Sequence, residues 1–145
     1  MNSASNRQKK KSLVIFAHSD GFDRLYQMAS IALTAAVSGR PVVVVLFFWA
    51  LRAVVKGIMD EPRVTAGDHE VKEEILRRVK STNNPPPSVM LSMARETGLV
   101  RLLACSASMQ YLGLGLEETA RVVDEVVGMP TILRVALEGV ETIYI

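Results

Sequence analysis

Short continuous runs of apolar residues predict β-strands along this chain. The runs cover 12–17 (SLVIFA), 41–47 (PVVVVLF) and 99–104 (LVRLLA), and each has the length of a strand. The segment 140–145 (VETIYI) alternates polar and apolar residues and predicts a last strand. The run 41–47 shows no alternation. We therefore expect both of its faces to be buried, as in a parallel sheet covered by helices on both sides.

Helical spacing of apolar residues separates these runs. Between 22 and 38, five apolar residues recur at intervals of three and four, and they are Leu25, Met28, Ala29, Ala32 and Ala36. Asp20 is expected to cap this helix by accepting from the free amides of its first turn. By similar signals, further helices are predicted over 48–56, 68–79, 88–97, 106–111, 116–127 and 131–137.

The alternation of strands and helices predicts an α/β fold. We expect a three-layer sandwich around a mainly parallel sheet of about five strands, with right-handed crossovers. Residues 12–145 form one domain in this interpretation, and residues 1–11 form a disordered basic tail. The segment 60–87 is a charged insertion that contains the proline-rich break 81–87 (STNNPPP).

Composition and charge exclude some functions. Hydrophobic residues make up 49% of the 145 residues, which is enough for a buried core. The net charge of +2 is more than accounted for by four basic residues of the tail, namely Arg7, Lys9, Lys10 and Lys11. The remaining domain is slightly acidic, so we expect no nucleic-acid partner. The tail either contacts an anionic partner or is a solvated leader.

The longest apolar stretch does not predict a membrane span. It runs over 41–51 and is ended by Arg52, whereas a spanning helix needs about 20 apolar residues. We expect it to be a strand that leads into a helix. The alternative is that 41–55 contacts a membrane or a membrane protein. No cleavage-site pattern follows the basic start. The single cysteine suits a reducing compartment, so a cytoplasmic location is expected.

The carboxyl ends of the predicted strands carry the residues with possible chemistry. In open parallel sheets, ligands bind beyond these ends, where the strand order reverses. The residues that follow the first three strands are His18, Ser19 and Asp20, then Phe48 and Trp49, then Cys105 and Ser106. If the first and third strands are neighbours, His18 and Cys105 lie at the same rim. The aromatic residues either line a cleft or are buried in the core or a subunit interface.

Cys105 is the candidate nucleophile. A helix that begins just after it offers free backbone N–H groups and a positive dipole end, which favour the thiolate. A thiolate can take up a sulfane sulfur, and Ser106 and Ser108 could donate hydrogen bonds to the resulting persulfide. The alternative is that Cys105 is a small buried hydrophobe. His18 is either a general base beside the thiolate or a turn histidine bonded to backbone.

Other chemistry finds no support in the sequence. The two histidines and the one cysteine are scattered, so we expect no metal site. The chain has no phosphate-binding P-loop, no GxGxxG fingerprint and no GxSxG nucleophile elbow. We therefore expect no cofactor.

Three segments together resemble a known family. They are His18-Ser19-Asp20-Gly21 after the first strand, LFFWAL over 46–51, and LVRLLACSASMQYLGLGLEE over 99–118. They resemble the DsrE/DsrF-like family, which includes sulfur-relay subunits of the TusBCD type and proteins described as peroxiredoxin-like. The resemblance covers 12–145 and is most specific over 100–115. It implies a flavodoxin-like, three-layer α/β domain that assembles into oligomers and carries sulfur as a persulfide at the position of Cys105.

These observations predict a sulfur carrier or sulfurtransferase. Cys105 would receive sulfane sulfur from a donor protein or small thiol and pass it to another molecule, because the chain has no second cysteine. A homo-oligomer is expected. The alternative is a non-enzymatic interaction subunit in which Cys105 is only packing. Peroxide reduction is disfavoured, since no cysteine is available to resolve a sulfenic acid within the chain. The insertion 60–87 and the very apolar second strand depart from plain relay subunits and leave partner and substrate open.

Overall fold

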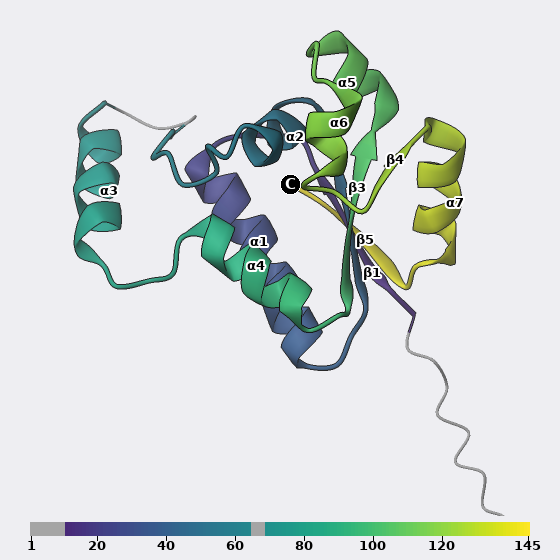
Figure 1. Ribbon diagram of the computed structural model, residues 1–145. Coiled ribbons are helices and arrows are strands. Elements are labelled where there is room, and N and C mark those ends of the chain that lie inside the picture. Colours follow the sequence, from purple (N-terminus) through teal and green to yellow (C-terminus); the bar gives the residue numbers. More distant parts are fainter. Residues whose placement is uncertain (1–10, 65–68) are drawn as a thin grey trace, which may run out of the picture.

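All strands of the described molecule lie in one parallel sheet. The computed structural model describes residues 11–64 and 69–145. The strands follow the spatial order β4-β3-β2-β1-β5 (Figure 1). Their bounds are β1 Leu13–Ala17, β2 Val42–Leu46, β3 Val100–Cys105, β4 Glu125–Val127 and β5 Glu141–Tyr144. Every neighbouring pair is parallel, which confirms the predicted fold class.

Helices cover both faces of the sheet. Figure 1 shows α1 and α4 on one side, α7 on the other, and α3 standing away from the sheet. The bounds are α1 Phe22–Val37, α2 Phe48–Val55, α3 His69–Ser81, α4 Pro87–Glu96, α5 Ser106–Tyr111, α6 Leu116–Ala120 and α7 Met129–Glu138. None of the helices in the described ranges is long and apolar enough to cross a membrane.

The continuous apolar run of β2 is explained by its central position. Successive side chains of a strand point to opposite faces. Val42, Val44 and Leu46 pack into the cluster that contains the buried residues of α1 and α4. Val43 and Val45 pack into the second cluster, which contains Ile132 of α7. The prediction that both faces of this strand are buried is confirmed.

One helix prediction is wrong at its second half. The predicted helix 116–127 ends at Ala120, and Glu125–Val127 forms strand β4. This strand pairs with Leu103, Ala104 and Cys105 of β3. A segment of three residues is too short to show a period of two, so the pattern of the sequence favoured continuation of the helix. The free edge of β3 decides the conformation instead.

The predicted cap of α1 is also wrong. Gly21 occupies the N-cap position of this helix, and no side chain caps it. The Asp20 carboxylate instead accepts from Arg63 at 2.9 Å. Asp20 therefore ties the β1–α1 turn to the insertion rather than to its own helix.

The remaining element predictions agree with the structure. The predicted helix 131–137 is confirmed as α7, which begins two residues earlier, with Pro130 in its first turn. The helix predicted over 68–79 is α3, although residue 68 lies outside the described residues. The predicted tail 1–11 also lies outside them, except for Lys11. The first and third strands are not neighbours, because β2 lies between them.

The chain reverses its course after β4. The strands β1 to β4 are added one beside the next, with α1 and α4 on one face. After β4 the chain crosses the other face through α7 and adds β5 beside β1. The strands β3 and β4 are thus adjacent, but the segments that follow them turn to opposite faces of the sheet.

Gly139 follows α7 at the point where the chain returns to the sheet. A substitution at this position tests how closely the end of α7 approaches β1. A Cβ at this position would lie 2.7 Å from Val14 Cγ2 and 3.1 Å from the Ser12 carbonyl oxygen. Val14 is fully buried and β-branched, so it has little freedom to move. We expect Gly139→Ser to lower the free energy of unfolding by about 1–3 kcal/mol through overpacking. Urea denaturation followed by circular dichroism measures this loss.

The matched control is Gly115→Ser. A Cβ there meets only Glu118 Cγ, at an ordinary 3.6 Å, and a serine is favourable at this N-cap position of α6. Its stability should equal or exceed that of the wild type. Equal unfolding midpoints for the two variants would contradict the close approach of Gly139 to β1.

Candidate functional site

The divergence of β3 and β4 defines the candidate site. Cys105 and Val127 are paired in register at the ends of these strands. Beyond Cys105 the chain enters α5, whose Met109 packs against the cluster on the α1 face. Beyond Val127 it passes Gly128 and enters α7 on the opposite face. In open parallel sheets this divergence is where ligands bind. We call Cys105, Ser106, Val127 and Gly128 the switch point.

Cys105 lies at the centre of the switch point and is almost completely buried. It is the last residue of β3 and the N-cap residue of α5, and only 3% of its surface is exposed. Its side chain belongs to the apolar cluster on the α7 face, together with Phe47, Val127 and Ile132. No side-chain hydrogen bond caps α5. A reagent must therefore displace part of this packing to reach the sulfur.

Two serines follow Cys105 on α5. Ser106 is half-buried and lies near the start of α7, since its Oγ is 4.0 Å from the position of a Cβ on Gly128. Ser108 is fully buried, and its hydroxyl makes no hydrogen bond within the described part of the chain. Ser108 is the third helical residue after the N-cap residue Cys105, so one helical turn separates the two along α5. An uncommitted hydroxyl donor thus lies one turn from Cys105.

His18 lies at the same edge of the sheet but not beside Cys105. It is exposed, and its ring stacks on Phe47 with a centroid distance of 4.6 Å and an interplanar angle of 8°. Its backbone N–H donates to the Ile145 carbonyl at 2.9 Å, and its carbonyl accepts from Ala50 at 3.2 Å. Because Phe47 follows β2 and packs in the cluster of Cys105, this ring lies between His18 and the sulfur.

Ser19 and Asp20 are engaged in other contacts. The Ser19 hydroxyl accepts from the Gly21 amide at 3.2 Å. Asp20 binds Arg63, which also donates to Glu61 at 2.6 Å. Hydrogen bonds to Glu61 and then to Asp20 raise the pKa of the Arg63 guanidinium above its ordinary value. The structure therefore does not join Ser19 or Asp20 to the switch point.

Exposed aromatic side chains lie on the helices that follow β2 and β3. Phe48 has a backbone φ of 36°, a left-handed conformation that is strained for a bulky residue. Its ring stacks on Tyr111 at the end of α5, with centroids 6.2 Å apart. Trp49 is 54% exposed at the start of α2. The strand ends in the sequence indicate Phe48 and Trp49, whereas no local pattern indicates Tyr111, because its partner is 63 positions away in the chain.

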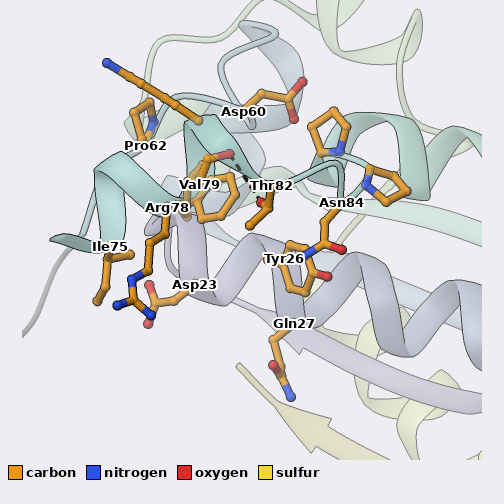
Figure 2. A pocket seen from close by; sticks show the side chains of 14 residues that line it. Asp23, Tyr26, Gln27, Asp60, Pro62, Ile75, Arg78, Val79, Thr82 and Asn84 are labelled. Atoms are coloured by element: carbon orange, nitrogen blue, oxygen red, sulfur yellow. Dashed lines mark hydrogen bonds between the residues drawn. The ribbon is translucent and has the colours of Figure 1, made fainter.

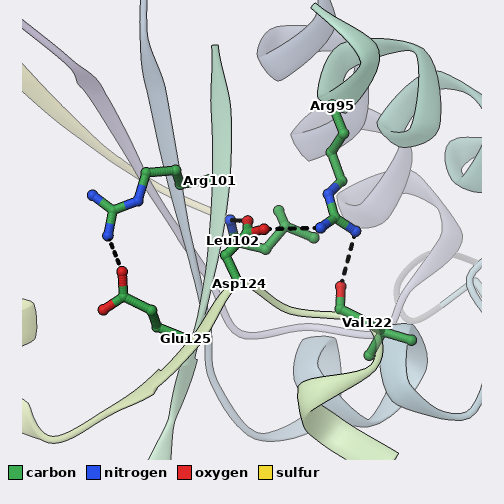
Figure 3. Close-up of polar contacts among 6 residues, drawn as sticks. All are labelled: Arg95, Arg101, Leu102, Val122, Asp124 and Glu125. Carbon is green, nitrogen blue, oxygen red and sulfur yellow. Dashed lines mark hydrogen bonds and ion pairs between the residues drawn. The ribbon is translucent and has the colours of Figure 1, made fainter. Parts of the chain in front are cut away.

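A polar network holds β4 beside β3 (Figure 3). Arg95 of α4 donates to the Val122 carbonyl at 3.1 Å and to Asp124 Oδ1 at 3.0 Å. Asp124 Oδ2 accepts from the Leu102 amide at 2.7 Å, and the Asp124 amide donates to the Leu102 carbonyl at 2.9 Å. No local pattern of the sequence indicates this network, because its members come from three separate segments.

Metal binding finds no support in the described ranges. Within residues 11–64 and 69–145, no group of three or more histidine, cysteine, aspartate or glutamate side chains could hold a metal ion.

Comparisons with known proteins support the fold and do not assign a function. No family model matches the chain, and no curated protein matches it. A conserved protein of unknown function from Bacteroides thetaiotaomicron, BT1422, has a similar solved structure. The TM-score is 0.60 at 15% identity, over 93% of this chain and 95% of that chain. The protein MTH1491 of unknown function from Methanobacterium thermoautotrophicum gives a TM-score of 0.55 at 17% identity, over 94% of this chain and all of that chain.

Removal of the polar network should make Cys105 more accessible to a reagent. Asp124→Ala removes the acceptor of the part-buried Leu102 amide and the partner of Arg95. We expect the free energy of unfolding to fall by about 1–3 kcal/mol. Because β4 is then held less firmly, native Cys105 should react faster with iodoacetamide than in the wild type. Mass spectrometry of timed samples measures the rate.

The matched control is Glu125→Ala. It removes only the exposed ion pair with Arg101, which should contribute no more than about 1 kcal/mol. Cys105 should then react at the wild-type rate. If both variants react alike, the Asp124 network does not control access to Cys105.

Proposed function

We propose that this chain is a cytoplasmic sulfur carrier of the sulfurtransferase type, which holds sulfane sulfur as a persulfide on Cys105. The observation that carries the proposal is the place of Cys105, at the end of β3 where the following segments of β3 and β4 turn to opposite faces of the sheet. The resemblance of 99–118 to the DsrE/DsrF-like family supports the same residue and the same chemistry.

The proposed reaction moves one sulfur atom without net oxidation. The Cys105 thiolate attacks the outer sulfur of a donor persulfide or polysulfide and forms a new S–S bond. The S–S bond of the donor breaks, and the donor leaves as a thiolate. In the second step a thiolate of the acceptor attacks the outer sulfur, and Cys105 leaves as a thiolate. The acceptor is another molecule, since Cys105 is the only cysteine.

Neighbouring groups suit the intermediate of this reaction. The Ser108 hydroxyl has no partner within the described chain and can donate to the outer sulfur of the persulfide. A buried polar group without a partner costs free energy, so a ligand that pairs with Ser108 is stabilised by it. Ser106 lies at the start of the same helix and can donate from the solvent side.

Access to Cys105 requires local opening of β4. This strand has only three residues and lies at the edge of the sheet, where β3 is its only neighbour. Short edge elements open with a smaller free energy than core strands. Displacement of Val127 and Gly128 would expose the sulfur without disturbing β1, β2 or β5.

A second candidate function follows from the burial of Cys105. With 3% exposure in an apolar cluster, the cysteine also fits a purely packing role in an interaction subunit. The two functions differ in one respect that can be measured, which is whether the native protein accepts sulfur.

Treatment of the native protein with polysulfide tests the proposal. We expect intact mass spectrometry to show a gain of one sulfur atom, which a small thiol removes. Cys105→Ser should show no gain. Ser108→Ala should still gain the sulfur but lose it several-fold faster, because the persulfide has lost a donor. If sulfur is added only after denaturation, or also to Cys105→Ser, the carrier function is wrong and the packing role stands.

We further propose that the chain forms a homo-oligomer through the outer face of α7. Met129, Leu133 and Leu137 follow one another at intervals of four and are 57%, 57% and 77% exposed. These three side chains form one stripe along the helix, and exposed apolar surface of this kind marks interfaces. The spacing is symmetric about Leu133, so an antiparallel second copy can present the same stripe in return.

Substitution of the central residue tests this interface. We expect light scattering to show an oligomer for the wild type and a monomer for Leu133→Arg, because the charge cannot be buried between two copies. Leu116→Arg is the control, since Leu116 is equally exposed but lies on α6. A monomeric wild type, or dissociation by Leu116→Arg as well, would exclude the α7 interface.

A further inference from the structure

A cavity of about 810 Å³ lies between α1, α3 and the segment 82–86, outside the switch point. Figure 2 shows side chains that line it, among them Tyr26 of α1, Val79 of α3 and Asn84 of the proline-rich segment. The volume falls in the range of small-molecule sites, which is about 300–1,000 Å³. None of the residues that line it belongs to the switch point.

The apolar face of α3 borders this cavity, and its exposure is the reason to expect a ligand there. This helix has 13 residues, and none of them is buried. Ile75 and Val79 lie on the side of α3 that lines the cavity. An amphipathic helix is ordinarily stabilised in a protein by packing of its apolar face. Here that face borders an open volume, so a molecule in the cavity would supply the missing contacts.

The segment 60–63, which forms one wall of the cavity, is bound to the body of the molecule. At one side, Asp60 accepts from both the amide and the hydroxyl of Ser88 at the start of α4. At another, the Arg63 side chain binds Asp20, and the Arg63 carbonyl accepts from the Phe22 amide at 2.6 Å. These contacts hold residues 60–63 against α1 and the start of α4. Asp60 and Pro62 of this segment line the cavity, so one of its walls belongs to the body of the molecule.

The lining selects an uncharged and mainly apolar ligand. Phe22 and Tyr26 present two rings with centroids 6.1 Å apart, and aliphatic and proline side chains form much of the rest. The charges of Asp23 and Asp60 are balanced by those of Arg78 and Lys80. Asp60 and Arg78 are moreover engaged with Ser88 and Glu74. A charged ligand would find no excess of opposite charge.

Two polar groups can orient such a ligand. The Tyr26 hydroxyl and the Asn84 side-chain amide both belong to residues that line the cavity, and neither makes a hydrogen bond within residues 11–64 and 69–145. We propose that this cavity binds a small, uncharged aromatic molecule that carries a hydroxyl or carbonyl oxygen. The aromatic ring of the ligand packs on Phe22 and Tyr26. Its oxygen atom forms a hydrogen bond with the Tyr26 hydroxyl or the Asn84 side-chain amide.

Titration with the uncharged fluorescent probe N-phenyl-1-naphthylamine tests the site. We expect saturable enhancement of its fluorescence with one site per chain. Val79→Asn should weaken the dissociation constant at least fivefold, because Val79 lines the cavity. Val71→Asn is the matched control, as it makes the same change on an exposed position of the same helix and should bind like the wild type. Circular dichroism verifies that both variants fold.

Competition between the fluorescent probe and two unlabelled compounds tests whether Tyr26 and Asn84 pair with an oxygen atom of the ligand. 2-Naphthol should displace the fluorescent probe at a several-fold lower concentration than naphthalene, and Tyr26→Phe should reduce this advantage. Leu116→Ser, at an exposed position of α6 outside the cavity, should bind the probe like the wild type. The proposal is overturned if the probe does not saturate, if Val71→Asn or Leu116→Ser weakens binding as much as Val79→Asn, or if the two competitors are equal.

Discussion

The handedness of the crossover connections determines where this molecule can place a site. Parallel strands joined through helices are connected in a right-handed sense, so strands added in one direction have their helices on one face. The strands β1 to β4 are added in one direction, and only the connection through α7 returns to the other side of the sheet. The ends of β3 and β4 are therefore adjacent while their continuations diverge. Cys105 lies at this position because of topology rather than because of any local motif.

The same constraint sets the strength of the packing around Cys105. The central strands β1, β2 and β3 each have neighbours on both sides, and their buried side chains fill both core clusters. By contrast, β4 has three residues and one neighbour, and it depends on Asp124 and Arg95 for its position. The cysteine thus lies between the most stable part of the sheet and its least stable strand. The proposed sulfur chemistry depends on this contrast, because it requires β4 to move locally before a donor can reach the buried sulfur.

Much of the fold could be predicted from the sequence, because local patterns carried it. The apolar runs at 12–17, 41–47 and 99–104 specified three strands, and the spacing of Leu25 to Ala36 specified α1. The strand β4 could not be predicted, since three residues show no period and their conformation depends on the free edge of β3. The position of Asp20 was missed for a related reason. Its partner Arg63 is 43 positions away, and no local pattern indicates that pair.

The candidate site was predictable only in part. The sequence places Cys105 and Ser106 at a strand end, and the structure bears out that placement. It could not show that Phe47 separates His18 from Cys105, because that depends on β2 lying between β1 and β3. Tertiary packing likewise determines the burial of the sulfur and the strained backbone of Phe48. It also leaves the Ser108 hydroxyl without a partner among the residues that the structure describes.

The central claim is that Cys105 at the switch point accepts and holds a sulfur atom. A crystal structure of the protein after polysulfide treatment tests it most directly. We expect an additional sulfur atom bonded to Cys105 Sγ within hydrogen-bonding distance of Ser108 Oγ, with Val127 or Gly128 displaced to admit it. An unmodified Cys105, still packed against Ile132 after the same treatment, would contradict the claim.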